Sequence, residues 1–504
     1  MIIMKKAIIA LGTLATMLLA ACSEDFITVK HNSSEPLDEY IIDESRMYQV
    51  LTAAYDPLEW FDYFYQYHNL AMVSDIMGDD IYCGGSNEGD QPILVKTHYY
   101  TATSIDCCDM IWTIAYSGIN RACHVLENVD GVPGMSNERK ARYKAEATIL
   151  KAYYYTVLWK FWGNIPYYDR NLEAPYVAAQ LGHDEVYEHI ATRIEEAIDM
   201  NALPMKVSGG EEGRVSLAMA YMLYAEVVMY QNDESRYAKA LGYMKEIIES
   251  GQYSLVADYA SIWLESGEWN SESIWEINYV SEGGVRSWDA PIATGGTIYP
   301  VLIGIPKAIG DYAEGWGFGP VAKSAYEMYE EGDIRRDGGI LNLEKYAEEN
   351  DIDLSGYEPR WQNTDYWLNK YMARVNGNHG FLGDANMNQG NNQRIYRYAE
   401  TLLNAAELSA LLGQDGSGYL KQVRDRAHSD ATGTSREDII EERHKEFVGE
   451  GKRYWDLVRS GLATTVLTAA NHEYRQVDWS ESKKYWPIPQ SEVDKDPSIR
   501  QNAY

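Results

Sequence analysis

Apolar residues recur at helical spacing through most of this chain. The clearest case lies between Ser136 and Asp169, where two sets of apolar positions, three or four residues apart, form two separate stripes. Ser136 is a suitable N-cap, and Gly163 followed by Pro166 is typical of a helix end. Because each apolar stripe needs a neighbour to cover it, we predict one long helix packed between two others, as in an α-superhelix of stacked helical hairpins.

Similar patterns predict two helical blocks, at about 44–250 and 393–474. The tripeptides at 144–146 (KAE) and 224–226 (YAE) occupy similar contexts and are spaced by about two hairpins of a tetratricopeptide-like repeat. The predicted fold is therefore all-α dominated, a tetratricopeptide-like α-superhelix. The individual helices are expected at Glu44 to Ala54, Tyr63 to Met72, Ile105 to Asn128, Glu185 to Met200, Ser216 to Tyr230, Ser235 to Glu249, Gln393 to Leu412, Tyr419 to Ala427, Arg436 to Phe447 and Trp455 to Ala470.

Three stretches interrupt this pattern. Residues 251–390 hold 19 of the 40 Gly and 7 of the 14 Trp, which predicts a loop-rich insertion with a few short strands. One of them is the run SIWEINYV, which places Trp275 in a strand core. Residues 74–105 are expected to form a long loop, and the prolines of the tail at 485–504 predict an extended segment. Long loops of this kind often carry function.

The first residues read as a lipoprotein signal. Residues 1–21 combine Lys5 and Lys6 with an apolar stretch that is too short to span a bilayer. They end in Leu-Ala-Ala before Cys22, which matches the bacterial lipobox, so Cys22 is the predicted lipidation site. Acidic residues follow directly, as in surface-exposed lipoproteins. We expect a tether at 22–43 and a single domain at 44–504, anchored to the outer membrane and facing the cell exterior.

Charge and composition narrow the range of ligands that we expect. A net charge of −32 makes nucleic acid a poor partner and disfavours anionic polysaccharides. A neutral oligosaccharide is the better match, unless the cations of the insertion converge on the site: Arg286, Lys307, Arg335, Arg336 and Arg360. The chain has 41 Tyr and 14 Trp against 7 Phe, and rings with a polar edge suit either ligand contact or a tolerant core.

Residue chemistry offers no catalytic set. Metalloprotease, hydrolase and P-loop motifs are absent from the sequence, and the pairs Glu195-Glu196 and Glu441-Glu442 suit solvated faces or ion pairs. We predict a protein that is not an enzyme and needs no cofactor. Calcium is an alternative at Asp351, Asp353, Ser355 and Gly356, although Gln362 stands where the closing Glu of an EF-hand belongs. Of Cys83, Cys107, Cys108 and Cys123, the last three suit small buried apolar residues, and no disulfide pairing is predicted.

The remaining signal is a set of loop aromatics beside Asp and Asn. Sugar rings stack their C–H faces on Trp and Tyr, while their hydroxyls need carboxylate or amide partners. The loop at 74–105 also offers Asn87 and Tyr100, and the insertion offers Asn270, Asp289 and Tyr357. The predicted ligand-binding residues are Asp79, Asp80, Tyr82, Tyr99, Trp269, Trp288, Tyr299, Trp316 and Trp361.

Five collinear blocks after the lipobox resemble the SusD/RagB family of outer-membrane nutrient-binding lipoproteins. They are WTIAYSGINRACHVLEN at 112–128, AEATILKAYYYTVLWKFWGNIP at 145–166, RYAETLLNAAE at 397–407, ERHKEFVGEGKRYWDLVRSG at 442–461, and the ending YWPIPQSEVDKDPSIRQNAY. Ile149 and Lys151 depart from the family pattern, which has an aromatic residue and an Arg there.

The resemblance implies a tetratricopeptide-based superhelix that binds a glycan without chemistry and caps a SusC-like TonB-dependent transporter. A peptide-binding lid of the same kind of transporter is the alternative. The resemblance also implies that Glu446, Glu450, Arg453 and Asp456 are internal ion-pair and capping residues. The ligand-binding residues named above are not carried over from the family.

Overall fold

A computed structural model describes residues 37–504, so the predicted signal peptide, Cys22 and most of the predicted tether lie outside the described residues. Helices dominate this part of the chain, and the strands in it pair two by two into small antiparallel sheets. The predicted all-α-dominated fold is confirmed.

Helix α7 (Asn137–Trp162) is the long helix predicted from the two apolar stripes. Ser136 caps it, because its Oγ accepts a hydrogen bond from the backbone N–H of Arg139 at 3.2 Å. Gly163 ends it with φ at +67°, a conformation that favours glycine. Side chains on both stripes, such as Ile149 and Leu158, are fully buried. The two expected neighbours are α6 (Asp109–Asn128) and α8 (His183–Asp199), which both pack on α7.

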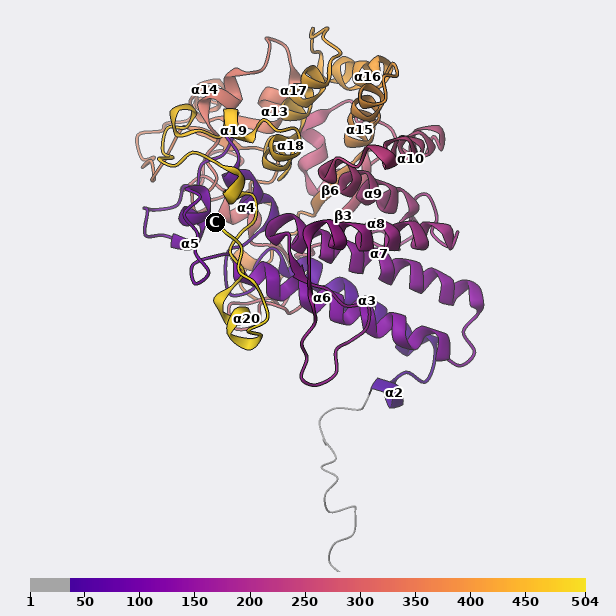
Figure 1. The fold of residues 1–504 in the computed structure, drawn as a ribbon. Helices are drawn as coiled ribbons and strands as arrows, with labels where there is room; N and C mark the ends of the chain where they lie inside the picture. Colours follow the sequence, from indigo (N-terminus) through magenta and orange to yellow (C-terminus); the bar gives the residue numbers. More distant parts are fainter. Residues whose placement is uncertain (1–36) are drawn as a thin grey trace, which may run out of the picture.

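The other long helices continue this stack in chain order (Figure 1). Helix α3 (Glu44–Trp60) packs on α6; α9 (Leu217–Gln231) packs on α8; and α10 (Tyr237–Glu249) packs on α9. After the insertion, α15 (Tyr398–Leu411) packs on α10 and is covered by α16 (Ser417–Ala427) and α17 (Arg436–Phe447). From α6 to α10, each helix thus packs mainly on the long helix before it and the long helix after it, as expected of stacked hairpins.

The insertion is joined to the superhelix by a two-stranded sheet. Strand β3 (Ser273–Ile277) pairs antiparallel with β6 (Gln393–Arg397), and β6 runs directly into α15. Trp275 lies in β3, is fully buried, and donates from Nε1 to the Gly213 carbonyl at 3.0 Å, so its predicted place in a strand core is confirmed. The rest of the insertion holds short elements: α11 (Tyr299–Leu302), α12 (Lys323–Glu327), α13 (Ile334–Gly339), β4 (Ile340–Asn342), α14 (Leu343–Glu349) and β5 (Tyr366–Leu368).

Two predictions near the N-terminal helices were wrong. Residues 63–69 are not helical, because α3 ends at Trp60 and α4 (Leu70–Met77) begins ten residues later. Asp62 directs its carboxylate at backbone N–H groups of the insertion, and Tyr65 has φ at +61°, which interrupts any helix. The stretch 74–105 is not one loop, since it contains the end of α4 and the whole of α5 (Pro92–His98), with Pro92 at its first position.

Three further boundaries differ from the prediction. Residues 393–397 form β6 before the helix begins, because they pair with β3. Residues 455–470 are split into α18 (Arg453–Arg459) and α19 (Ala463–Val466), with Gly461 at φ +78° between them. The tail contains one short helix, α20 (Gln490–Lys495), which Pro489 precedes as its N-cap. Also present is the short pair β1 (Ile165–Pro166) and β2 (Gln180–Leu181).

The C-terminal tail returns to the end of α7. Trp486 packs on Phe161 with ring centroids 4.4 Å apart and on Trp162 at 5.6 Å. Asn502 donates from Nδ2 to the carbonyls of Trp162, at 2.7 Å, and Trp486, at 2.8 Å. The last residues of the chain therefore complete the packing of a helix that begins more than 300 positions earlier.

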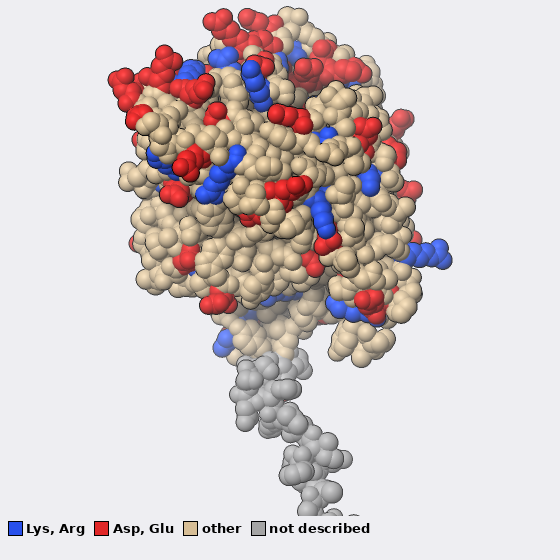
Figure 2. All heavy atoms as spheres, turned by 90° about the vertical axis from the view of Figure 1, so that its left-hand side faces the viewer, with Lys and Arg blue, Asp and Glu red and all other residues tan. Residues whose placement is uncertain are grey.

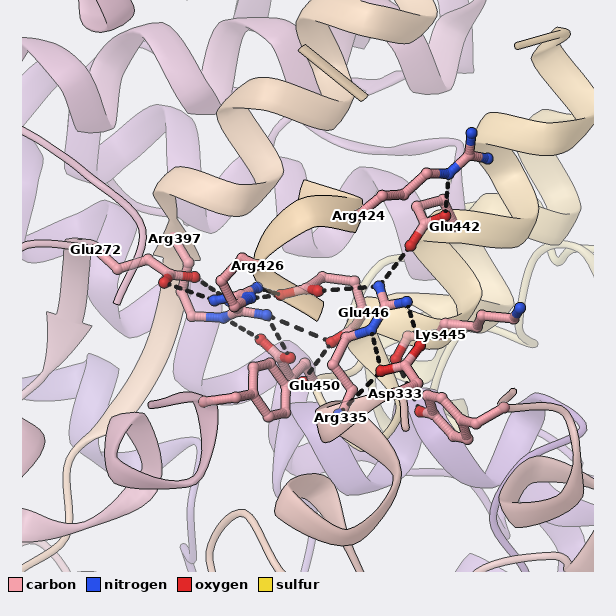
Figure 3. A network of polar contacts seen from close by, with 12 residues as sticks. Glu272, Asp333, Arg335, Arg397, Arg424, Arg426, Glu442, Lys445, Glu446 and Glu450 are labelled. Carbon is pink, nitrogen blue, oxygen red and sulfur yellow. Dashed lines mark hydrogen bonds and ion pairs between the residues drawn. The ribbon is translucent and has the colours of Figure 1, made fainter. Parts of the chain in front are cut away.

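A buried network of ion pairs joins the insertion to the end of β6, α16 and α17 (Figure 3). At its centre, Glu446 accepts from Arg397 at 3.1 Å and from Arg335 at 3.3 Å, and it also pairs with Arg426. Glu450 accepts twice from Arg397 at 2.8 Å. Burial alone would raise the pKa of the Glu446 carboxyl, but the surrounding guanidinium groups lower it to about 2. The expected internal ion pairing of Glu446 and Glu450 is confirmed.

The same holds for the other acidic and basic residues predicted to pair internally. Asp456 contacts Arg443 and Arg459, and Arg453 holds Asp79. Glu442 bridges Arg335 and Arg424 at 2.6 Å each. These charges are satisfied inside the protein.

Charged side chains are unevenly distributed over the surface of the described residues. Figure 2 shows acidic side chains gathered at the upper end of one face, above a broad area with few charges. Among residues 37–504, none of the helices combines the length and the apolar character needed to span a membrane.

Cys83, Cys107, Cys108 and Cys123 are all buried free thiols, and burial raises the pKa of each.

Candidate functional site

Four aromatic rings meet where the insertion contacts the segment after α3. Trp288 and Trp316 lie stacked, with ring centroids 6.0 Å apart and planes inclined by 24°. Tyr63 meets Trp288 edge-on at 5.4 Å, and Tyr67 meets Trp316 edge-on at 5.7 Å. Tyr63 is buried, whereas Tyr67, Trp288 and Trp316 are partly exposed. We call these four residues the aromatic platform.

A buried ion pair ties the two parts of the platform together. Asp62 precedes Tyr63, and Arg286 lies two residues before Trp288. Arg286 donates from Nη1 to Asp62 Oδ2 at 2.8 Å and from Nη2 to the Tyr63 carbonyl at 2.7 Å. Asp62 also accepts from the Thr297 hydroxyl and from the backbone N–H groups of Ile298 and Tyr299. Both oxygens of Asp62 and all three guanidinium nitrogens of Arg286 thus have hydrogen-bond partners inside the fold.

Hydrogen bonds hold the loop that carries Trp288. The indole Nε1 of Trp288 donates to Asp384 Oδ2 at 2.8 Å. Asn388 donates from Nδ2 to the carbonyls of Arg286 and Asp384. Gly296 is required there, because a Cβ at that position would lie 2.2 Å from the Gln389 carbonyl oxygen. Hydrogen bonds to its indole N–H and to the backbone of its loop therefore fix the Trp288 ring.

Trp316 is held by a different set of contacts. Its backbone N–H donates to the Val301 carbonyl at 2.9 Å, and Arg360 Nη1 donates to its carbonyl at 2.8 Å. Trp361 follows Arg360 and is partly exposed. Gln362 then accepts from the Gly84 N–H at 2.9 Å. The loop after α4 thus lies next to the segment that supports Trp316.

The chemistry of the platform is that of a neutral, amphipathic surface. Burial raises the pKa of Tyr67 to about 12, so its hydroxyl stays protonated at neutral pH and can donate and accept. Tyr65, beside the platform, is 60% exposed. Parallel indole faces flanked by hydroxyl and carboxylate groups suit a ligand with flat apolar faces and a polar edge.

The five cations that could have made the site anionic-selective do not gather there. Arg286 is engaged with Asp62, Arg335 with the network around Glu446, and Arg336 with Asp337. Lys307 lies next to Gly356. Two members of this set contact platform residues, both through backbone carbonyls: Arg286 binds that of Tyr63, and Arg360 binds that of Trp316.

Several predicted ligand residues lie away from the platform. Asp79 is held by Arg453, from Nε to Oδ1 at 2.8 Å and from Nη2 to Oδ2 at 2.9 Å. Asp80 is buried and pairs with His444 Nε2 at 2.6 Å. Tyr82 is buried and packs edge-on against His472 at 4.9 Å. These three side chains have internal partners.

The remaining predicted residues differ in exposure. Tyr299 is buried against Tyr371, with centroids 5.6 Å apart, although its backbone N–H helps to hold Asp62. Tyr99 and Trp269 are partly exposed, and the Trp269 N–H donates to Glu276 at 3.0 Å. Of the nine residues, the structure thus brings Trp288 and Trp316 together in one surface, and Trp361 directly follows Arg360, which binds the Trp316 carbonyl.

Sequence reasoning missed Tyr63, Tyr67, Asp384 and Asp62. The run YFYQY at 63–67 was assigned to a helix, and its density of tyrosines was the available signal for a surface. Asp62 and Asp384 carry no local signal, because their roles depend on residues 235 and 96 positions away.

Two groups were tested as cation sites. Asp79, Asp80 and His444 offer ligand atoms within 4.8 Å of one another, but Arg453 occupies both oxygens of Asp79. In the segment at 351–356, the Asp353 carboxylate accepts hydrogen bonds from the backbone N–H and the hydroxyl of Ser355. The ammonium of Lys307 lies next to Gly356, which opposes a cation there, so this segment does not fit a calcium loop.

Comparison with known proteins gives a consistent relationship along the chain. Residues 271–504 match the model described as "SusD family", and residues 25–225 match the model described as "Starch-binding associating with outer membrane". Surface glycan-binding protein A from Bacteroides thetaiotaomicron has a similar structure, with a TM-score of 0.87, 43% identity, and coverage of 92% of this chain and 100% of that chain. Its complex with laminarihexaose matches with the same TM-score at 42% identity, over the same shares of the two chains.

More distant relatives are also described as SusD-like proteins. A laminarin binding SusD-like protein shares 29% identity at a TM-score of 0.81, over 92% of this chain and 99% of that chain. SusD-like protein P25 from Formosa agariphila is 24% identical over 434 residues, 77% of each chain. This chain belongs to the SusD/RagB family.

Proposed function

We propose that this protein is a non-catalytic, lipid-anchored glycan-binding protein of the outer membrane, which binds a neutral oligosaccharide on the aromatic platform. The observation that carries the proposal is the stacked pair Trp288 and Trp316, partly exposed and fixed by Asp384 and Arg360. Sugar rings bind such faces through their C–H groups. Carboxylate, hydroxyl and guanidinium groups at the edge supply partners for sugar hydroxyls.

We further propose a laminarin-type glucan as the ligand. The relative solved with laminarihexaose is 42% identical and covers 92% of this chain, and a second laminarin-binding relative is 29% identical. A neutral glucan also agrees with the acidity of the chain and with the internal engagement of most cations in the insertion. Delivery of the bound glycan to a SusC-like TonB-dependent transporter completes the proposal.

Isothermal titration with laminarihexaose, maltohexaose, cellohexaose and xylohexaose tests the ligand. We expect the wild type to bind laminarihexaose with the highest affinity, and the variants Trp288→Ala and Trp316→Ala to bind at least about tenfold more weakly, a loss of about 1.4 kcal/mol. Trp269→Ala is the matched control, since Trp269 is partly exposed but outside the platform. Equal affinity of all four proteins would exclude the platform as the site.

Native mass spectrometry of the purified protein separates the glycan from the peptide alternative. Co-purified peptides that are displaced by no glycan of the panel would favour a peptide-binding lid. Reducing-sugar release by the purified protein would contradict the non-catalytic assignment. Affinity purification from outer membranes of the native host tests the transporter partner, and absence of a TonB-dependent barrel from the eluate would contradict it.

A further inference from the structure

A second recessed surface lies far from the platform along the chain, between α6, the connection from α7 to α8, and α20. It is a cavity of about 320 Å³, which falls in the size range of small-molecule sites. None of its lining residues belongs to the platform. Its aromatic members are Trp112, Tyr116, Tyr168 and Tyr176, and its ionisable members are Glu492, Lys495 and Asp496.

One wall of this cavity is a fixed set of aromatic rings. Tyr116 and Tyr168 lie stacked, with centroids 6.1 Å apart and planes inclined by 20°, and Trp112 meets Tyr116 at 5.0 Å. The Tyr116 hydroxyl donates to the Pro166 carbonyl at 2.6 Å, and the Tyr168 N–H donates to the Tyr155 hydroxyl at 2.9 Å. This wall is therefore in place before any ligand arrives.

The opposite wall is polar and comes from α20. Glu492 accepts from Lys495 at 2.6 Å through Oε1. Asp496 accepts from the Ser498 N–H and hydroxyl through Oδ1. The hydrogen bonds that each of these two carboxylates accepts from residues 491–498 thus use one of its two oxygens. The arrangement of flat aromatic faces opposite carboxylate and ammonium groups is the chemistry that recognises a sugar ring and its hydroxyls.

The mouth of the cavity exposes apolar groups. Tyr176 is 72% exposed and Val177 is 48% exposed. Both lie on the connection between α7 and α8, and this connection is tied to the tail: Gln180 donates to the Arg500 carbonyl at 3.0 Å and accepts from the Arg500 N–H at 2.8 Å. A ligand in the cavity would cover Tyr176, which now presents its ring to solvent.

We infer that this cavity is a second glycan-binding site, separate from the platform, which takes a short segment of a neutral oligosaccharide against Tyr116, Tyr168 and Tyr176. A chain with two such sites would hold one polysaccharide at two points, and binding to polymer would then exceed binding to short oligosaccharides through effective concentration. The choice of a glucan as probe rests on the proposed function, whereas the cavity itself does not.

Native mass spectrometry with laminarihexaose, and then with the other hexasaccharides named above, counts the occupied sites. The proteins compared are the wild type, the platform variant Trp288→Ala/Trp316→Ala, the cavity variant Tyr176→Ala/Glu492→Gln, and the combination of all four substitutions. We expect two, one, one and no bound oligosaccharides. Tyr48→Ala is the control for loss of an exposed tyrosine, because Tyr48 is 44% exposed on α3, and it should keep both sites.

The outcomes separate the two proposals. One oligosaccharide on the wild type, lost in the platform variant and kept in the cavity variant, overturns the second site and leaves the proposed function intact. Binding that survives in the platform variant but disappears in the cavity variant supports the cavity and overturns the platform. A co-purified peptide that is lost on Tyr176→Ala would assign the cavity to a polypeptide and overturn the inference. Equal melting temperatures of the variants establish that each is folded.

Discussion

Arg286 and Asp62 form a buried ion pair, with Nη1 2.8 Å from Oδ2, at the junction between the insertion and the end of α3. The pair connects the loop of Trp288 to the segment of Tyr63 and Tyr67. The partly exposed stack of the platform therefore depends on a charge pair that is itself buried. A site assembled from two distant segments needs such a fixed connection if its rings are to be in register before binding.

Asp62→Asn should weaken both folding and binding. The substitution leaves the Arg286 guanidinium buried without its counter-charge, which typically costs about 3–5 kcal/mol. We expect a lower urea midpoint and at least tenfold weaker affinity for laminarihexaose. The control is Asp56→Asn, six residues earlier in α3, because Asp56 pairs with Arg121 at a partly exposed site, with 47% of its side chain exposed, and such pairs are worth about 0–1 kcal/mol. Similar losses in the two variants would contradict a special role of Asp62.

Asp384→Ala should reduce affinity more than stability. Without Asp384, the Trp288 indole loses the acceptor at 2.8 Å that fixes its plane. A hydrogen bond of this kind contributes about 1 kcal/mol, so we expect affinity to fall about fivefold with a small change in melting temperature. Asp289→Ala removes an exposed carboxylate directly after Trp288 and is the matched control. An unchanged titration isotherm for Asp384→Ala would show that this hydrogen bond is dispensable.

Glu446 should make the free energy of unfolding depend on pH. Its pKa in the fold, about 2, lies below the ordinary value of about 4.3 in an unfolded chain. Its contribution is therefore fully present above the unfolded value and is lost as pH falls towards 2. Glu446→Gln should lower the unfolding free energy at pH 7 by about 3–5 kcal/mol and flatten its dependence on pH below about 4.5. Glu441→Gln, on the exposed face of the same helix, should change neither, as measured by urea unfolding at several pH values.

Replacing either of two helical glycines by alanine should change the stability of the fold, but in opposite directions. A Cβ on Gly118 of α6 would lie 2.3 Å from the Tyr154 ring on α7, so Gly118→Ala should separate the two helices and cost about 1–3 kcal/mol. Gly242 of α10 has open space around that position, so Gly242→Ala should stabilise by about 0.5–1 kcal/mol through helix propensity. Thermal melting of the two variants gives the signs, and a rise for Gly118→Ala would refute the close packing of α6 on α7.

Local signals predicted the superhelix well. The bounds of α7 follow from Ser136, Gly163 and the apolar spacing, all of which act within one or two helical turns. The predictions for residues 63–69 and 393–397 are wrong because the partners of their backbone come from distant segments: Arg286 binds the Tyr63 carbonyl, and β6 pairs with β3. Helical spacing cannot report such contacts.

The candidate site shows the same limit. Trp288 and Trp316 were chosen because they are aromatic residues in a Gly-rich stretch, and they lie in one stack. Asp80 and Tyr299 were chosen on equal grounds, yet both are buried with internal partners. Composition identifies residues that are able to contact a sugar, whereas exposure depends on how the loops fold over one another.

The return of the tail to α7 has a consequence for synthesis. Trp486 and Asn502 complete the surroundings of Phe161 and Trp162, yet a ribosome makes them more than 300 residues later. Until these later residues have been made, the first helical hairpins have an uncovered aromatic end. Removal of residues 485–504 would therefore leave the rings of Phe161 and Trp162 open to solvent, and we expect such a chain to behave as a folding intermediate.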